Sequence, residues 1–325
     1  MVACPHVYFA DRWVTRDEAK VSIDSLAMRY AISVFEGIRI YSQIDRTLSP
    51  RPFLLDEHIE RLRNSLALMR LPDPGVDRLP ALIEELIHRN DIHEDAYVRV
   101  AVTAANAGDL GTEALPALTV TATPMGRKRW LARSEAMSLT ISDWRRAPTS
   151  VFPPAAKNIS NYAGPRLAWL AAREAGFDGC VLTNHAGRLC EAPTAALFLV
   201  RDGVLLTPHL SEDVLPSITR AWILRTAEEH GIPARETGLT RADAGEADEA
   251  FLCGTGIEIA PVRAFDGRAC RDWPDSPLTR TLIIAYFVAA RGAGSFRALG
   301  DLSPIRRDEL INGPISTSAE TQVAK

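Results

Sequence analysis

The 325-residue chain lacks the features that mark several large classes of protein. Its five cysteines are odd in number and never stand in C-x-x-C spacing, so neither a disulfide framework nor a zinc site is expected. No segment approaches 18 uninterrupted apolar residues, and the first residues lack a charged start followed by an apolar run. A formal net charge of −4 gives no general attraction to nucleic acid or to an anionic membrane. These absences favour a cytoplasmic globular protein without a metal.

What remains is an ordinary folded composition, with 46% hydrophobic and 24% charged residues and no internal repeats. The length suits one large domain or two smaller ones. The run Gly126–Arg133 breaks the hydrophobic pattern with a burst of charge, which indicates a linker. We therefore predict a small domain over residues 1–126, a linker over 127–136, a large domain over 137–302 and a poorly ordered tail over 303–325.

The N-terminal part reads as an α+β unit. Strands are predicted near Val7, turning at Asp11, and over 33–41, 96–103 and 117–122, and helices over 53–71 and 79–89. The run Ser33–Tyr41 is β-branched and aromatic, which suits a strand buried on both faces. Asp56 is the expected N-cap of the first helix.

The C-terminal part adds a strand over 138–142, a helix over 162–175 ended by Gly176, a helix over 215–230 ended by Gly231, and a strand over 249–254. Two β-hairpins are predicted between these elements, over 180–191 and 196–207. The first would turn at Asn184–Gly187 and the second at Asp202-Gly203, which is a strong hairpin signal.

One lysine is unusually placed. Lys157 lies among small and apolar residues just beyond a Pro pair, with Tyr162 five positions further on. Such a lysine is either a solvated surface charge or an amine in a partly dry site, where its pKa falls and it can act as a nucleophile or base. The local sequence leaves both interpretations open.

Four other features share a chemical use with Lys157. Ser217–Thr219 and Gly254–Gly256 are places where backbone N–H groups can receive a phosphate, and Arg61 could add charge. Glu191 is a carboxylate at a strand end beside apolar residues. Each has a plainer interpretation, as a helix cap, an ordinary turn, a solvated arginine or an exposed strand end. Together they are the parts that pyridoxal phosphate requires: a lysine, a carboxylate for the ring nitrogen, and a phosphate cup.

The order of the motifs resembles a known family. They are Tyr30-Ala-Ile-Ser-Val-Phe-Glu-Gly-Ile-Arg39, His58-Ile-Glu-Arg61, Ala96-Tyr-Val-Arg99, Ala155-Ala-Lys157 with Asn161-Tyr162, Cys190-Glu191-Ala, Leu215-Pro-Ser-Ile-Thr-Arg220, and Cys253-Gly-Thr-Gly256 with Ile259-Ala-Pro-Val262. In this order they resemble the class IV (fold type IV) aminotransferases, and within them most closely the branched-chain amino acid aminotransferases. The matches run from about Val7 to Gly267, which is most of the chain.

The resemblance implies a role for each of these residues. Lys157 would form the Schiff base with pyridoxal 5'-phosphate and act as the general acid and base. Tyr162 would bond the phenolic oxygen of the cofactor and Glu191 its pyridine nitrogen. The phosphate would be held by Arg61, Ile218, Thr219 and Thr255. The substrate α-carboxylate would meet Tyr97, Thr255 and Gly256, and the side-chain pocket would be lined by Tyr30, Phe35, Gly37 and Arg39 near Arg99.

The resemblance also implies an α/β fold of two domains, a small N-terminal one and a larger one with a β-barrel-like core, assembled as a homodimer or a higher homo-oligomer. The loop Gly108–Gly111 would reach the partner's active site. An amino group would pass between a branched-chain or related amino acid and a 2-oxo acid, with glutamate and 2-oxoglutarate as partner pair. A lyase of the same fold acting on a chorismate-derived substrate, a D-amino acid aminotransferase and a cofactor-binding protein without turnover are the alternatives.

The chain departs from the family pattern in several places, one of which is the mild change of a glycine to Ser217 at a helix start. After Glu191 it has Ala192, Ala195 and Ala196 where the family shows glycine and polar residues, so fewer hydrogen bonds to the cofactor ring are expected. Charged and polar residues also stand where apolar ones would suit an aliphatic substrate: Asp109, Thr112 and Glu113 in the loop, and Arg127, Lys128 and Arg129 in the linker. These charges leave the identity of the amino acid open.

Overall fold

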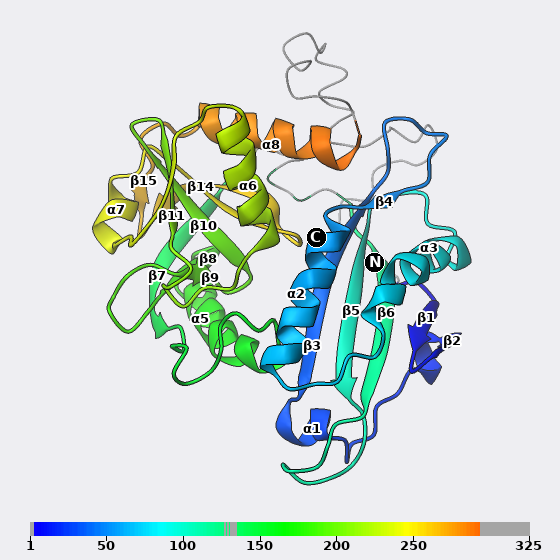
Figure 1. The fold of residues 1–325 in the computed structure, drawn as a ribbon. Coiled ribbons are helices and arrows are strands. Elements are labelled where there is room, and N and C mark those ends of the chain that lie inside the picture. Colours follow the sequence, from blue (N-terminus) through cyan, green and yellow to red (C-terminus); the bar gives the residue numbers. More distant parts are fainter. Residues whose placement is uncertain (1–2, 127, 129, 131–134, 293–325) are drawn as a thin grey trace.

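The computed structural model describes residues 3–126, 128, 130 and 135–292, and two β-sheets organise it (Figure 1). The first sheet contains β1 (His6–Phe9), β2 (Arg12–Thr15), β3 (Ser33–Tyr41), β4 (Arg51–Pro52), β5 (Ala96–Ala104) and β6 (Pro116–Pro124). Its strand order is β2-β1-β6-β5-β3-β4, and every neighbouring pair is antiparallel. The helices of this part are α1 (Leu26–Tyr30), α2 (Leu55–Leu68) and α3 (Leu79–Arg89).

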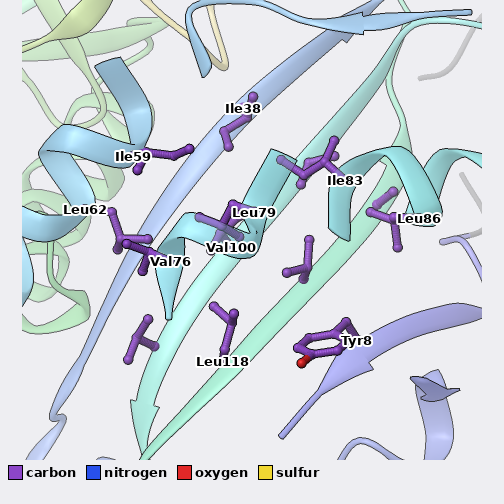
Figure 2. Packing of buried hydrophobic residues seen from close by; sticks show 14 of the residues in the cluster. Tyr8, Ile38, Ile59, Leu62, Val76, Leu79, Ile83, Leu86, Val100 and Leu118 are labelled. Atoms are coloured by element: carbon purple, nitrogen blue, oxygen red, sulfur yellow. The ribbon is translucent and has the colours of Figure 1, made fainter. Parts of the chain in front are cut away.

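Helices α2 and α3 cover one face of this sheet and create its core (Figure 2). Leu62 of α2 and Ile83 of α3 pack with Val100 of β5, and all three are almost completely buried. Each such side chain contributes about 1.5–3 kcal/mol through burial. As the alternation in 96–103 predicts, Tyr97 and Arg99 point to the other face, which is less buried. That face is where the site described below forms.

The second sheet follows from Met137 onward. Its strands are β7 (Met137–Arg145), β8 (Gly179–Thr183), β9 (Glu191–Ala192), β10 (Ala195–Arg201), β11 (Val204–Pro208), β12 (Ala234–Thr237), β13 (Glu249–Gly254), β14 (Glu258–Phe265) and β15 (Arg268–Ala269). Its main path runs β12-β11-β10-β13-β14-β7-β8. Among the described strands no pairing joins β12 to β8, so these strands do not form a closed barrel. The helices of this part are α5 (Ala163–Glu174), α6 (Ile218–Glu229), α7 (Arg241–Gly245) and α8 (Pro277–Ala290).

Helix α5 packs on β7 and β8, whereas α6 and α8 share a separate apolar cluster with β10 and β13. Phe198 of β10 and Phe251 of β13 stack in that cluster with ring centroids 5.0 Å apart. In the described part of the chain, no helix is both long and apolar enough to cross a membrane.

Most of the predicted elements are confirmed, and strand 33–41 and helix 79–89 have the predicted bounds. The hairpin at Asp202-Gly203 is also confirmed, because both residues have positive φ (51° and 76°) and Arg201 pairs with Val204. Gly176 and Gly231 follow α5 and α6 with positive φ, as expected of glycines that end helices.

The hairpin over 180–191 is confirmed with its turn at Asn184–Gly187: Asn184 N donates to Arg188 O at 2.9 Å, Thr183 bridges Leu189, and Cys190 N donates to Leu182 O at 2.9 Å. Its last residues also pair with β10, as β9.

Two details of the prediction were wrong. The N-cap of α2 is Leu54 in a left-handed conformation, and Asp56 lies inside the first turn. The short helix α1 was not predicted, since five residues are too few to show a helical period.

Residues 127, 129, 131–134 and 293–325 lie outside the described residues, so most of the predicted linker and the whole predicted tail are not assessed. The domain boundaries therefore stay a prediction.

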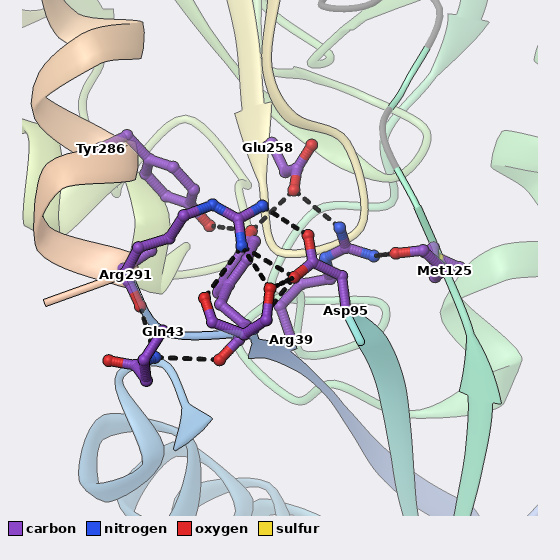
Figure 3. Close-up of polar contacts among 10 residues, drawn as sticks. Arg39, Gln43, Asp95, Met125, Glu258, Tyr286 and Arg291 are labelled. Carbon is purple, nitrogen blue, oxygen red and sulfur yellow. Dashed lines mark hydrogen bonds and ion pairs between the residues drawn. The ribbon is translucent and has the colours of Figure 1, made fainter. Parts of the chain in front are cut away.

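A buried polar cluster joins the two sheets (Figure 3). Arg39 of β3 donates to Glu258 Oε1 of β14 at 2.9 Å, and Tyr41 Oη donates to the same oxygen at 2.7 Å. Arg291, just after α8, pairs with Asp95 at 2.6 Å. Buried charges of this kind are tolerated only when they are paired, so the cluster fixes β3 against β14 and the end of α8.

Candidate active site

A cavity of about 640 Å³ collects most of the predicted site residues. This volume lies in the range of small-molecule sites, about 300–1,000 Å³. The predicted residues that line it are Phe35, Gly37, Arg61, Tyr97, Arg99, Lys157, Tyr162, Glu191, Ile218, Thr255 and Gly256. They come from both halves of the chain, separated by up to 221 positions in sequence between Phe35 and Gly256. The fold therefore brings predicted site residues that lie far apart in the sequence into one cavity.

The backbone around Lys157 is fixed to the first sheet. Phe35 N donates to Lys157 O at 2.9 Å, and Lys157 N donates to Ser65 Oγ at 3.0 Å. Asn158 forms an isolated bridge with Val34 next to these bonds. The lysine thus belongs to a segment of the second half that is held by β3 and α2, which sets the direction in which its side chain enters the cavity.

The amine of Lys157 has an aromatic and hydroxyl environment. Its Nζ donates to Tyr162 Oη at 2.9 Å and lies 4.8 Å from the ring centroid of Phe35. Burial, reinforced by the Arg61 guanidinium, lowers the pKa of Lys157 to about 8. Burial also raises the pKa of Tyr162 to about 12, so its phenol stays protonated at neutral pH. The amine is consequently much easier to deprotonate than an ordinary lysine.

Glu191 lies in the cavity wall, 7% exposed, opposite an arginine that the sequence did not single out. Arg146 Nη2 is 2.6 Å from Glu191 Oε1, and Leu215 N donates to Oε2 at 3.2 Å. Burial raises the pKa of Glu191, and the Arg146 charge opposes that rise. The carboxylate is held firmly and still has lone pairs for a further donor.

Arg61 is positioned by Glu36. Its Nε and Nη2 each donate to a Glu36 oxygen at 2.8 Å, and its Nη1 donates to Pro216 O at 2.9 Å. Burial works against ionisation of Glu36, but Arg61 outweighs it and holds the pKa of that carboxyl well below its usual range. These bonds use three of the five N–H groups of the guanidinium, so two can bind an anion.

His58 extends the same group of charges. Its Nδ1 lies 2.7 Å from Glu36 Oε2, and its Nε2 lies 3.4 Å from Thr255 Oγ1. Burial lowers the pKa of His58 despite the neighbouring Glu36, so the imidazole is neutral at pH 7. A neutral ring that donates from Nδ1 to Glu36 leaves Nε2 as an acceptor, which the Thr255 hydroxyl can approach.

The N-terminus of α6 completes an anion site. Ser217 caps the helix by accepting a bond from Arg220 N at 3.3 Å, and Ser217 and Ile218 line the cavity. The N–H groups of Ile218 and Thr219 form no hydrogen bond to any described residue, as expected in the first turn of a helix. With Arg61 nearby in the same wall, this is a suitable place for a phosphate.

Glycines make room on the substrate side. A Cβ on Gly37 would collide with the ring of Tyr97, and a Cβ on Gly256 would stand 4.0 Å from that ring. Arg99, on the same face of β5 as Tyr97, has its guanidinium 4.0 Å from the ring centroid of Phe35. The phenol of Tyr97 can lie across β3 only because position 37 has no side chain.

Three of the predicted residues do not line the cavity. Thr219 is buried in α6 and can contribute only its backbone, and Tyr30 at the end of α1 packs beside the first core. Arg39 is 1% exposed and engaged by Glu258 and by the carbonyl of Met125, so the expected contact with substrate is replaced by a structural ion pair.

Four residues of the site were missed from the sequence: Glu36, His58, Arg146 and Trp130. Glu36 could have been found, because a carboxylate inside a strand buried on both faces needs a partner. His58 could then have been found as a second partner of Glu36, because it lies one helical turn before Arg61 on α2. Arg146 carries no such signal, since it follows another arginine at a strand end. Trp130 lines the cavity from a segment that showed only charge.

The donor set fits pyridoxal phosphate. An amine of lowered pKa, a fixed carboxylate and a phosphate cup of Arg61 with the start of α6 share one cavity. The unused N–H groups of Arg61 and of the first turn of α6 can bind an anion, which the phosphate would supply. The amine, the carboxylate and the phosphate cup are thus the groups that would hold the cofactor.

Comparison with known proteins shows the family to which the chain is similar. The model of the family "Amino-transferase class IV" matches residues 33–265. The branched-chain-amino-acid aminotransferase of Salmonella typhimurium is 34% identical over 288 residues, covering 87% of this chain and 92% of that protein. The protein of the same name from Escherichia coli is 33% identical over 290 residues, with the same coverage of 87% and 92%.

Solved structures are similar over nearly the whole chain. The branched-chain aminotransferase from Thermoproteus uzoniensis with norvaline superposes with a TM-score of 0.84 at 30% identity, covering 92% of this chain and 98% of that one. A branched-chain amino acid aminotransferase from T.th., solved with pyridoxamine 5'-phosphate, gives a TM-score of 0.82 at 31% identity, with coverage of 90% and 96%. The two-sheet α/β architecture is thus that of fold type IV.

Proposed function

The chain belongs to the class IV aminotransferases, and from that premise we propose how its own residues perform the reaction. It is a pyridoxal-phosphate-dependent aminotransferase, which moves an amino group between an amino acid and a 2-oxo acid. Branched-chain amino acids are the proposed substrates because the relatives carry that name, and glutamate with 2-oxoglutarate is the proposed partner pair. The observation that supports catalysis most directly is the Lys157 amine, buried beside Tyr162 in the cavity that Glu191 also lines.

When bound, pyridoxal phosphate supplies an electron sink for the pair left on the substrate Cα. Lys157 is the proposed base that removes the Cα proton, since its pKa of about 8 makes a neutral amine accessible near neutral pH. The hydrogen bond from Nζ to Tyr162 Oη fixes where the amine stands. Lys157 can then return the proton to a neighbouring atom without crossing the cavity.

The other residues are proposed to bind the cofactor and the substrate and to orient them. Glu191 is proposed to keep a proton on the ring nitrogen, and Arg146 fixes the carboxylate for that purpose. Arg61, the N–H groups of Ile218 and Thr219, and Thr255 are proposed to bind the phosphate. Tyr97 with the turn at Gly256 is proposed to receive the substrate α-carboxylate. The rigid Glu36–Arg61 pair means that the phosphate cup needs no rearrangement, which is the condition for precise positioning.

A single half-reaction tests this function. The cofactor-loaded protein is mixed with glutamate, and both the absorbance of the bound cofactor and the release of 2-oxoglutarate are recorded. We expect a stoichiometric spectral change with equal release of the 2-oxo acid, and none in Lys157→Ala. Leucine, isoleucine and valine are tested in parallel as donors. If no amino acid changed the spectrum of the loaded protein, transamination would be ruled out.

Assembly as a homodimer is part of the proposal. Exposed apolar side chains occur on α1, before it, and in the nearby loop between β5 and β6: Ile23, Met28, Leu110 and Leu115, with exposures of 80%, 64%, 74% and 65%. The helix and the loop are tied by a bond from Arg29 Nη1 to Gly108 O at 2.8 Å and lie together in Figure 1. Such a patch suits a second copy of the chain, and it includes the loop expected to reach the partner's site.

Two domains divided at residues 127–136 are proposed as well. The last strand of the first sheet ends at Pro124 and the first strand of the second begins at Met137, so the boundary falls between sheets.

A further inference from the structure

His58 lies behind the wall of the cavity, enclosed between two polar partners. It belongs to α2 and is 1% exposed. Its Nδ1 is 2.7 Å from Glu36 Oε2, and its Nε2 is 3.4 Å from Thr255 Oγ1. Thr255 does line the cavity, in the turn between β13 and β14. Any hydrogen bond that connects His58 to a ligand therefore passes through the Thr255 hydroxyl.

The protons in this row of groups can be counted. Glu36 accepts two bonds from Arg61 and is ionised, so it has no proton to donate. His58 Nδ1 is then the donor to Glu36, and a neutral His58 has no proton on Nε2. The only hydrogen bond of the Thr255 hydroxyl to a described residue is the one with this Nε2. The single hydroxyl proton of Thr255 is therefore directed to His58.

An anion beside Thr255 changes this count. The oxygens of a phosphate dianion or a sulfate can only accept, so the Thr255 hydroxyl has to turn its proton to the anion. His58 Nε2 and Thr255 Oγ1 would then face each other with lone pairs alone, and a buried acceptor without a donor costs free energy. A proton taken up from solvent at Nε2 removes the conflict. The imidazolium donates to Glu36 and to Thr255, and the hydroxyl donates to the anion.

The charges that face His58 favour the same change. They are Glu36 from β3, Arg61 from the next turn of α2, and Lys157 from the segment before Tyr162. Burial is the largest effect on the pKa of His58 and lowers it, Glu36 raises it, and the two cations lower it further. An anion offsets the charges of Arg61 and Lys157, so it makes the imidazolium easier to form.

We propose, on the premise that the phosphate binds at Thr255 as in the function above, that His58 takes up one proton when a dianion binds there. His58 is thus a positioning residue: as the imidazolium it holds the Thr255 hydroxyl in the orientation that donates to the anion. Because the proton binds together with the anion, the affinity for the anion should rise as the pH falls. This rise is confined to the interval between the pKa of His58 in the free protein and its pKa in the complex.

Nitrogen NMR of protein labelled in its seven histidines tests the proposal without turnover. The spectra compare, at pH 7, the cofactor-free protein, the same protein with sulfate, and the protein loaded with pyridoxal phosphate. Sulfate is a dianion throughout the neutral range, and chloride keeps the ionic strength constant. We expect one protonated and one bare ring nitrogen of His58 in the cofactor-free protein, and two protonated nitrogens with either anion. The His58 signals are those that disappear in His58→Asn.

The pH dependence of binding gives a second measurement. Pyridoxamine 5'-phosphate is titrated into the cofactor-free protein at pH 6 and pH 8. The ratio of the Kd at pH 8 to the Kd at pH 6 should be about three- to tenfold larger in the wild type than in His58→Asn, since one proton corresponds to about tenfold per pH unit. Ionisation of the ligand affects both proteins equally. His88→Asn, at an exposed histidine of α3, is the matched control and should keep the wild-type ratio.

Three results would overturn the proposal: a bare Nε2 that persists with both anions, an imidazolium already present in the cofactor-free protein, or full proton uptake by His58 in Thr255→Val. If His58→Asn did not fold, its signals would be identified by substituting the other six histidines in turn. The proposed function can fail separately. A protein whose His58 becomes protonated with sulfate, but whose bound cofactor reacts with no amino acid, would contradict transamination and leave this inference intact.

Discussion

The amine of Lys157 is surrounded by groups that disfavour its charge. Burial is the largest effect and the guanidinium of Arg61 the second, whereas the carboxylates of Glu36 and Glu191 oppose them. The result is a pKa of about 8, compared with about 10.4 for an ordinary lysine. The amine is therefore protonated below about pH 8 and available as a base above it.

This pKa predicts the pH dependence of chemical labelling. After removal of the cofactor, the acylation rate of Lys157 should rise with pH and level off above about 8, since only the neutral amine reacts. Peptide mass spectrometry over pH 6–11 would measure the profile, with the exposed Lys20 in the same samples as internal reference. A Lys157 profile that kept rising in parallel with Lys20 would contradict the lowered pKa.

At the scale of elements, Glu36 connects β3 to α2. It is 1% exposed and binds both Arg61 and His58 of the helix. Because a buried charge without its partner is strongly destabilising, this carboxylate sets the position of α2 as well as that of Arg61.

We predict that Glu36→Gln lowers the free energy of unfolding of the cofactor-free protein by about 3 kcal/mol. The loss should be smaller with pyridoxal phosphate bound, because the phosphate then supplies the negative charge that Arg61 lacks. Urea unfolding with and without the cofactor measures both values. Glu85→Gln, which breaks the half-exposed pair with Arg89, is the control and should cost less than about 1 kcal/mol. Equal losses with and without cofactor would argue against phosphate binding at Arg61.

The sequence predicted elements well where local physics decides them. Strand 33–41, helix 79–89 and the turn at Asp202-Gly203 follow from composition, period and turn chemistry. It failed where tertiary contacts decide: the hairpin over 180–191 forms, but the pairing of β9 with β10 and the bond from Leu189 N to Leu239 O at 2.7 Å were not predicted. Local sequence contains no signal for a partner 50 residues away.

The site residues also divide into those that the sequence predicts and those that only tertiary contacts decide. The order of motifs predicted Lys157, Tyr162 and Glu191 as members of one site, and all three line the cavity. The ion pair of Glu191 with Arg146 could not be predicted, because the sequence does not show which of the two adjacent arginines at the end of β7 turns toward Glu191. Arg39 was assigned to the substrate for its place in a motif, whereas its side chain is committed to Glu258 on the other sheet.

At the scale of the whole molecule, the Arg39–Glu258 pair bridges the two sheets on which the cavity depends. Glu258 lies four residues after Gly254 and just beyond the turn that carries Thr255 and Gly256, and β3 carries Phe35 and Gly37. The pair therefore sets the distance between the two walls of the site. Both side chains are 1% exposed, so neither can be solvated if the other is removed.

A double-mutant cycle tests this bridge. Arg39→Met alone should lower the free energy of unfolding by about 3–5 kcal/mol, because it leaves Glu258 buried with the neutral Tyr41 hydroxyl as its partner. The double variant Arg39→Met with Glu258→Gln should recover part of that loss, since no uncompensated charge remains. The same cycle on Arg89 and Glu85 should give a coupling below about 1 kcal/mol. Additive losses at Arg39 and Glu258 in urea unfolding would mean that the two sheets are held together by apolar packing around α8 and not by this ion pair.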